Sequence, residues 1–80
     1  MIVEEIRATI LAALPDAEVM VNDPMSDGQH FQAVVICPQF EGLSLVKQHQ
    51  MVMRPLTQAF ATTVHALSLK TFSPSQWDAQ

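Results

Sequence analysis

Residues 64–77 have the sequence VHALSLKTFSPSQW, and the organisation of the chain follows from this stretch. Its first eight side chains alternate between two faces with a period of two, as in a β-strand. His65, Leu67 and Leu69 share one face, and the residues between them share the other. The alternation predicts a strand with one face against a core and a histidine at its start.

The second half of the stretch predicts a short helix. Ser73 suits the N-cap, Pro74 the first helical position, and Gln76 can complete a capping box. Trp77 is the only tryptophan, and we expect it to fold back from this helix onto the apolar layer.

Hydrophobic periodicity predicts further segments before this stretch. Apolar residues recur every four positions along 2–14, which favours a helix that ends at Pro15. Residues 17–22 and 30–37 are rich in residues that favour strands, and the near-continuous apolar character of 30–37 is typical of a central strand. Residues 43–62 have helical periodicity.

We expect a short turn near 43–48 and then a longer helix that bends or restarts at Pro55. The apolar stripe of this helix consists of Leu45, Val46, His49, Val52, Met53, Leu56 and Phe60. Residues 38–42 before it predict a turn. The predicted order is α-β-β-α-(α)-β-α, a single α+β domain over residues 1–80 with helices on one face of a three-stranded sheet.

Composition and charge restrict the class of protein. The chain has 80 residues, 49% of them hydrophobic, and a formal net charge of −4. No apolar run approaches the roughly 20 residues that span a bilayer, and Glu4 and Glu5 stand where a signal peptide would be positive. Cys37 is the single cysteine, which excludes an internal disulfide and favours a reducing compartment. We therefore expect a cytoplasmic protein without membrane contact.

The fixed positive charges are few, namely Arg7, Lys47, Arg54 and Lys70. Only Lys47 and Arg54 are near one another, whereas nucleic-acid-binding proteins usually have a clustered basic face. The charge pattern therefore argues against tight binding of DNA or RNA. The sequence also lacks a G-x-S-x-G motif, carboxylates at a pocket-forming spacing and a phosphate-binding glycine loop, so neither an enzyme nor a small-molecule substrate is expected.

Several segments match a known family in the same order along the chain. They are DGQHFQ at 27–32, FEGLSLVK at 40–47, QHQ at 48–50 with RPL at 54–56, HALSLK at 65–70 and SPSQW at 73–77. Together they resemble the BolA-like family, and more closely its short IbaG-type branch. The resemblance covers nearly the whole chain and implies a fold like the type II KH domain. The G-x-x-G with which true KH domains grip nucleic acid is absent, because Gly28 and Gly42 are the only glycines.

The resemblance also implies a partner, a monothiol glutaredoxin, with a [2Fe–2S] cluster that bridges the two proteins. The glutaredoxin supplies a cysteine and bound glutathione, and the BolA-like protein supplies a histidine at the start of its last strand, which corresponds to His65. A second Cys or His often comes from the loop of the hairpin that the first two strands form. This chain has neither between Asn22 and Gln29, so His30, at the end of the loop, is the candidate. Neutral imidazole binds iron and replaces thiolate in some [2Fe–2S] sites.

Some members of the family are described as transcriptional regulators. Many relatives have Arg-His-Arg where this chain has Gln48-His49-Gln50, and the loss of two arginines weakens the expectation of DNA binding.

Each candidate residue also has a purely structural interpretation. By position alone, His65 is a strand histidine bonded to a backbone carbonyl, and His30 suits a structural role or a partner contact as well as coordination. His49 is expected at the boundary of the middle helix without chemistry. Cys37 is expected to be a small buried hydrophobe.

Three hypotheses follow. The first is a non-catalytic adaptor that binds a monothiol glutaredoxin and shares a [2Fe–2S] cluster through His65, with His30 as second candidate ligand. Lys47 and Arg54 would attract the acidic or glutathione-bearing partner, although an ordinary solvated face is their default interpretation. The second is a KH-like nucleic-acid-binding regulator, and the third a protein-interaction module without metal.

Overall fold

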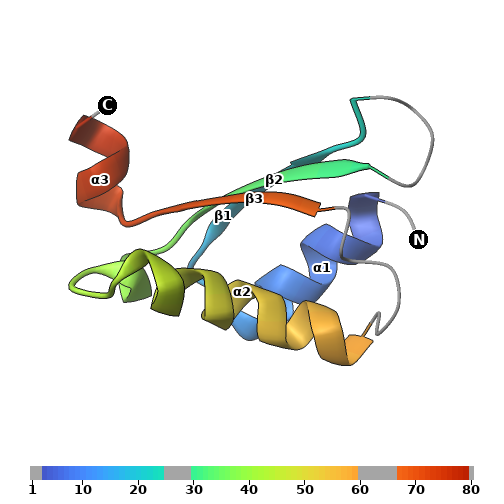
Figure 1. Cartoon of the computed structure of the whole chain (residues 1–80), viewed down its shortest axis with the longest axis horizontal. Coiled ribbons are helices and arrows are strands. Elements are labelled where there is room, and N and C mark those ends of the chain that lie inside the picture. Colours follow the sequence, from blue (N-terminus) through green and yellow to red (C-terminus); the bar gives the residue numbers. More distant parts are fainter. Residues whose placement is uncertain (1–2, 25–29, 60–66, 80) are drawn as a thin grey trace.

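The structure is a computed structural model that describes residues 3–24, 30–59 and 67–79. The elements along the chain are α1 (Val3–Ala13), β1 (Glu18–Asn22), β2 (Phe31–Ile36), the 3₁₀ helix η1 (Pro38–Phe40), α2 (Leu45–Ala59), β3 (Leu67–Phe72) and α3 (Pro74–Ala79). The predicted α+β class and the three-stranded sheet are confirmed (Figure 1).

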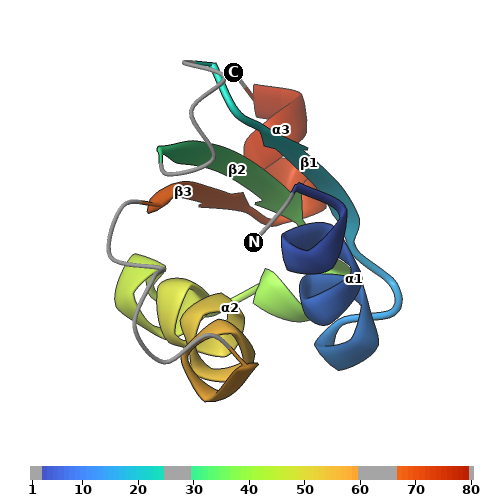
Figure 2. The ribbon, with the colours of Figure 1, turned by 90° about the vertical axis from the view of Figure 1, so that its right-hand side faces the viewer.

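The sheet has the strand order β1-β2-β3, so β2 is central, as its apolar sequence predicts. β1 and β2 are antiparallel, with Val19 opposite Val35, and β2 and β3 are parallel, with Phe31 opposite Leu67. A parallel pair needs a crossover, and α2 supplies it. α1 and α2 cover one face of the sheet, while α3 lies past the end of β3 on the other side (Figures 1 and 2).

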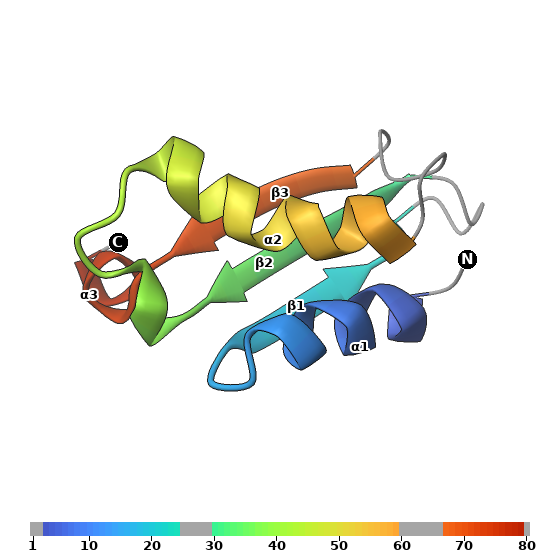
Figure 3. The ribbon, with the colours of Figure 1, turned by 90° about the horizontal axis from the view of Figure 1, so that it is seen from below.

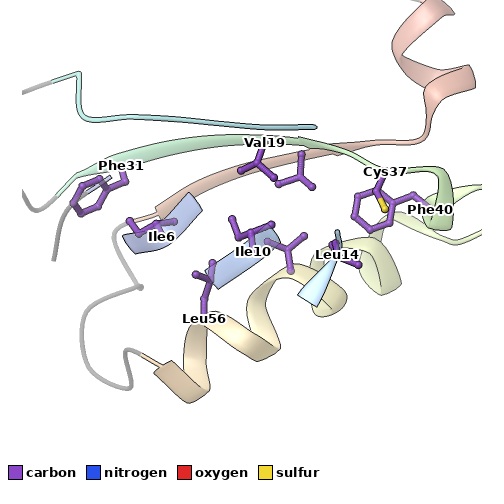
Figure 4. Packing of buried hydrophobic residues seen from close by; sticks show 10 residues of the cluster. Ile6, Ile10, Leu14, Val19, Phe31, Cys37, Phe40 and Leu56 are labelled. Carbon is purple, nitrogen blue, oxygen red and sulfur yellow. The ribbon is translucent and has the colours of Figure 1, made fainter. Parts of the chain in front are cut away.

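The core lies between the sheet and the two long helices (Figure 4). α1 contributes Ile6 and Ile10, which are fully buried, and α2 contributes Val52 and Leu56. Burial of each such side chain contributes about 1.5–3 kcal/mol. Cys37 is also fully buried in this cluster, which confirms its expected role as a small hydrophobe.

The middle helix differs from its prediction. It is one α-helix from Leu45, without the expected turn near 43–48, and it does not restart at Pro55, which lies inside it. A proline in a helix interior costs about 3 kcal/mol, but burial of Val52 and Leu56 on either side of Pro55 offsets this cost. The helix starts where it does because Ser44 Oγ accepts a hydrogen bond from the backbone N–H of Lys47 at 3.3 Å.

The expected apolar stripe is also wrong at its first two members. Leu45 and Val46 are 60% and 66% exposed, and the buried position in this turn belongs to Gln48, which is 1% exposed. The Gln48 carboxamide is satisfied by a hydrogen-bond network. Its Oε1 accepts from Thr71 Oγ1 at 2.9 Å. Its Nε2 lies within hydrogen-bond distance of three acceptors, which are the backbone oxygens of Phe40 (3.4 Å) and Leu43 (3.1 Å) and Oε1 of Gln76 (3.3 Å).

The start of α3 has the predicted capping box. The backbone N–H of Gln76 donates to Ser73 Oγ at 3.2 Å, and the backbone N–H of Ser73 donates to Gln76 Oε1 at 2.8 Å. Trp77 does not reach the core, however. It is 39% exposed and packs edge-on against Phe72, with ring centroids 5.3 Å apart. Alternation along β3 turns Phe72 away from the helices, and α3 follows it to that side.

Glu41 links η1 to α3. Its Oε2 accepts a hydrogen bond from Ser75 Oγ at 2.8 Å and a longer one from the Ser75 backbone N–H at 3.4 Å. These bonds, the hydroxyl bond first, hold the pKa of the Glu41 carboxyl below its ordinary value. They favour the ionised form because a carboxylate oxygen is a stronger hydrogen-bond acceptor than the oxygen of a neutral carboxyl.

Replacement of Gln48 by alanine should lower the free energy of unfolding by about 2–4 kcal/mol, because it removes the network and leaves a cavity beside buried acceptors. A domain of this size has about 5 kcal/mol in total. Urea denaturation measures the change. The control is Gln50→Ala, on an exposed turn of the same helix, which should stay within about 0.5 kcal/mol. Equal midpoints for the two variants would contradict the structural role of Gln48.

Replacement of Glu41 by glutamine should lower the melting temperature at neutral pH but not in acid. Since the pKa of the folded-state carboxyl is lowered, its stabilisation is present above the unfolded-state pKa and is lost as pH falls through the folded-state value. Melting curves of both proteins from pH 7 downward should therefore converge in acid. Ser75→Ala should add nothing in the Glu41→Gln background, and a full additional effect would show that the two side chains act separately.

Candidate functional site

The predicted principal residue, His65, lies outside the described residues, so its role stays a prediction. β3 is described from Leu67 onward. The predicted alternation of β3 holds there, since Leu67 and Leu69 are half-buried against the core and Ser68 and Lys70 are exposed.

The sheet edge at which β2 and β3 begin, here called the amino edge, is defined by the parallel register. Phe31 is opposite Leu67, so both strands start at the same level. His30 directly precedes β2 and is exposed. The fold therefore brings His30 to the edge from which the chain enters β3, and residue 65 stands two positions before Leu67 in the sequence.

The described residues do not form a complete metal site. Among them, no group of three His, Cys, Asp or Glu side chains is arranged to hold a metal ion. The Cys37 thiol is fully buried, which prevents it from reaching an external metal. His49 is half-buried on α2, as expected for a boundary residue. His30 is thus the exposed imidazole of the described chain, and any iron held there requires further ligands from elsewhere.

Lys47 and Arg54 lie together, as predicted, and line one groove. The groove has a volume of about 280 Å³ and is completed by Leu43, Gln50 and Met51. Both cationic residues are exposed, while Leu43 and Met51 are half-buried and pack against the core. This surface, here called the α2 groove, has two half-buried apolar residues beside two exposed positive charges. The methionines of the sequence, Met51 among them, suggest a partner surface, whereas Leu43, which precedes α2, was not singled out from the sequence.

The α2 groove lies on the flank of α2 that is turned toward α1. Side chains of a helix advance by about 100° per residue, so Met51 and Arg54 share a flank with Pro55 and Gln58. Pro55 and Gln58 line a second groove together with residues of α1. α1 packs on β1, and α2 packs on β3 and on α1 (Figure 2). The two cations therefore lie on a different flank from His49, which is turned the other way.

No helix among the described residues is long and apolar enough to cross a bilayer.

Comparisons with known proteins agree on one family. The sequence pattern described as BolA-like protein matches residues 6–76. The acid stress protein IbaG of Escherichia coli (strain K12) is 38% identical over 74 residues, which cover 91% of this chain and 84% of that protein. The DNA-binding transcriptional regulator BolA of the same strain is 30% identical over 78 residues, covering 94% of this chain and 74% of that protein. A bolA protein homologue from Coxiella burnetii has a structure with a TM-score of 0.80 and 34% identity, covering 98% of this chain and 97% of that one.

Proposed function

Since the chain belongs to the BolA-like family, we propose that it is a non-catalytic adaptor that binds a monothiol glutaredoxin and shares a [2Fe–2S] cluster with it. The similar proteins are named as a stress protein and a transcriptional regulator, not as enzymes. The proposed ligand from this chain is the His65 imidazole, with His30 as second candidate. We place the adaptor in the cytoplasm, where a reducing environment suits the free thiol of Cys37.

The observation that supports this proposal best is the parallel register of β2 and β3. β3 begins at Leu67, and His65 stands two positions before Leu67 in the sequence. Leu67 is opposite Phe31, and His30 directly precedes Phe31. His30 therefore lies at the sheet edge where β3 begins, and the proposal takes its other histidine from the segment that leads into β3.

The donor set fits a shared cluster better than a resident one. The described residues offer one exposed imidazole and no accessible thiol, and iron in such clusters usually prefers thiolate. A glutaredoxin cysteine and bound glutathione would supply these thiolates. When bound, the cluster would add one-electron redox chemistry or be cargo for transfer. An imidazole ligand also makes binding pH-dependent, because protonation of the ring releases the metal.

Mixing the protein with a monothiol glutaredoxin, iron, sulfide and glutathione should produce a coloured heterocomplex. Its absorption and circular dichroism should differ from those of the glutaredoxin homodimer. His65→Ala should abolish that difference, or lower the cluster yield by at least the roughly tenfold loss typical of substitutions beside a metal ligand. His30→Ala reports in the same way on the second ligand.

The matched control for this experiment is His49→Ala, which removes an imidazole from α2 rather than from the amino edge. It should leave the spectrum unchanged. An unchanged spectrum for His65→Ala would overturn the ligand assignment. If His49→Ala changed the spectrum as much as His65→Ala, the change would point to a general effect on folding.

The name of the E. coli regulator supports nucleic-acid binding as a second candidate. The charges of this chain oppose it, because four Lys and Arg stand against eight Asp and Glu, and phosphate neutralisation supplies most of non-specific DNA affinity. Electrophoretic mobility at low salt should therefore show no shift of duplex DNA at micromolar protein. A shift that disappears in Lys47→Gln/Arg54→Gln would instead favour the regulator.

A further inference from the structure

We propose that the α2 groove binds an acidic segment of the partner protein, at a place separate from the amino edge. The acidic segment would carry two carboxylates, one for Lys47 and one for Arg54, with an apolar side chain between them on Leu43 and Met51. The identity of the partner rests on the function proposed above, whereas the chemistry of the segment follows from the groove itself.

The charge distribution selects an acidic occupant. In a chain of net charge −4, two of the four fixed cations line this one groove. Arg7 is engaged elsewhere, since it pairs with Glu4 at 4.0 Å and donates to the backbone oxygen of Val19 at 3.4 Å. Within the described residues, Lys47 and Arg54 form no ion pair of their own. They are therefore available to an external anion, and exposed pairs of this kind contribute mainly to steering and specificity.

The positions of Lys47 and Arg54 on α2 determine how far apart the two carboxylates of the acidic segment must be. Lys47 and Arg54 are seven residues apart on one helix, which is two turns or about 10.5 Å. A partner helix with carboxylates seven positions apart presents the same interval. One apolar residue between them would reach Met51, a flexible thioether side chain that adapts to different partners. The Gln50 amide adds a hydrogen-bonding group at the rim. The proposed occupant is accordingly an acidic amphipathic helix.

The position of the α2 groove makes docking independent of iron. The groove lies on the α1 flank of α2, whereas His30 and the beginning of β3 lie at the amino edge of the sheet. A partner held in the groove can therefore remain bound with or without a cluster. Loss of the groove should lower the affinity for apo and cluster-loaded partner by the same factor, while loss of His65 should affect only the loaded form.

A synthetic helical peptide tests the groove without any assumption about the partner. The probe has two glutamates seven positions apart and a leucine between them, and the control peptide has glutamine at both acidic positions. Titration into ¹⁵N-labelled protein should shift the amide signals of residues 43–54. The affinity should fall about fivefold in Lys47→Gln/Arg54→Gln, as expected from two exposed ion pairs, and should weaken with salt. Lys70→Gln, on the opposite face of the sheet, should have no effect.

Several results would overturn the proposal. They are equal binding of the glutamine peptide, equal binding by the groove variant, or shifts centred outside residues 43–54. Short duplex DNA that shifts the same amides at lower concentration than the peptide would assign the groove to nucleic acid instead.

Titration of a monothiol glutaredoxin separates this inference from the proposed function. If the groove variant loses affinity equally for apo and cluster-loaded glutaredoxin, the result would support both the groove inference and the proposed function. If the acidic peptide binds the groove but glutaredoxin binding is unchanged by the variant, the acidic-helix site stands and its assignment to glutaredoxin is overturned.

Discussion

The burial of the Gln48 carboxamide is the constraint on which the positions of α2, β3 and α3 depend. A buried amide must find partners for its oxygen and its two hydrogens, because an unsatisfied polar group costs about 1–3 kcal/mol. The partners of Gln48 are the side chains of Thr71 in β3 and Gln76 in α3, together with two backbone oxygens. These oxygens belong to Phe40 and Leu43. Gln76 in turn accepts from the Ser73 backbone in the capping box. One side chain thereby joins elements that are up to 28 residues apart.

This constraint also determines the direction in which the α2 groove faces. Helical side chains have fixed angular positions relative to one another, so Gln48 in the core turns Lys47 outward and directs Met51 and Arg54 to the α1 flank. Val52 and Leu56 continue the buried line that Gln48 begins. The α2 groove is therefore a consequence of which side chains α2 buries, and its two cations keep a spacing that no flexible loop would hold.

The sequence predicts what depends on local patterns and misses what depends on tertiary partners. A near-continuous apolar run identifies β2, alternation identifies β3, and the Ser-Pro-x-Gln order identifies the capping box, because each signal lies within a few residues. Gln48 was not predicted to be buried, since a polar residue gains that position only if Thr71 and Gln76 arrive from far along the chain. The sequence predicts a bend or a restart at Pro55 for the same reason: the packing that offsets the cost of a proline within one continuous helix comes from outside that helix. Trp77 packs on Phe72 at the outer side of the sheet, a contact that was not expected from the sequence although alternation along β3 assigns Phe72 to that side.

The crossover determines how the α2 groove and the amino edge lie relative to one another. Because β2 and β3 are parallel, α2 has to run from the end of β2 back toward the amino edge (Figure 3). Lys47 is therefore near the far end of the groove, and Arg54 is two turns, about 10.5 Å, closer to the amino edge. A helix seated along the α2 groove would point one end toward the edge where His30 lies. The α2 groove and the amino edge thus differ in the flank that they occupy, while the axis of α2 runs from the first toward the second.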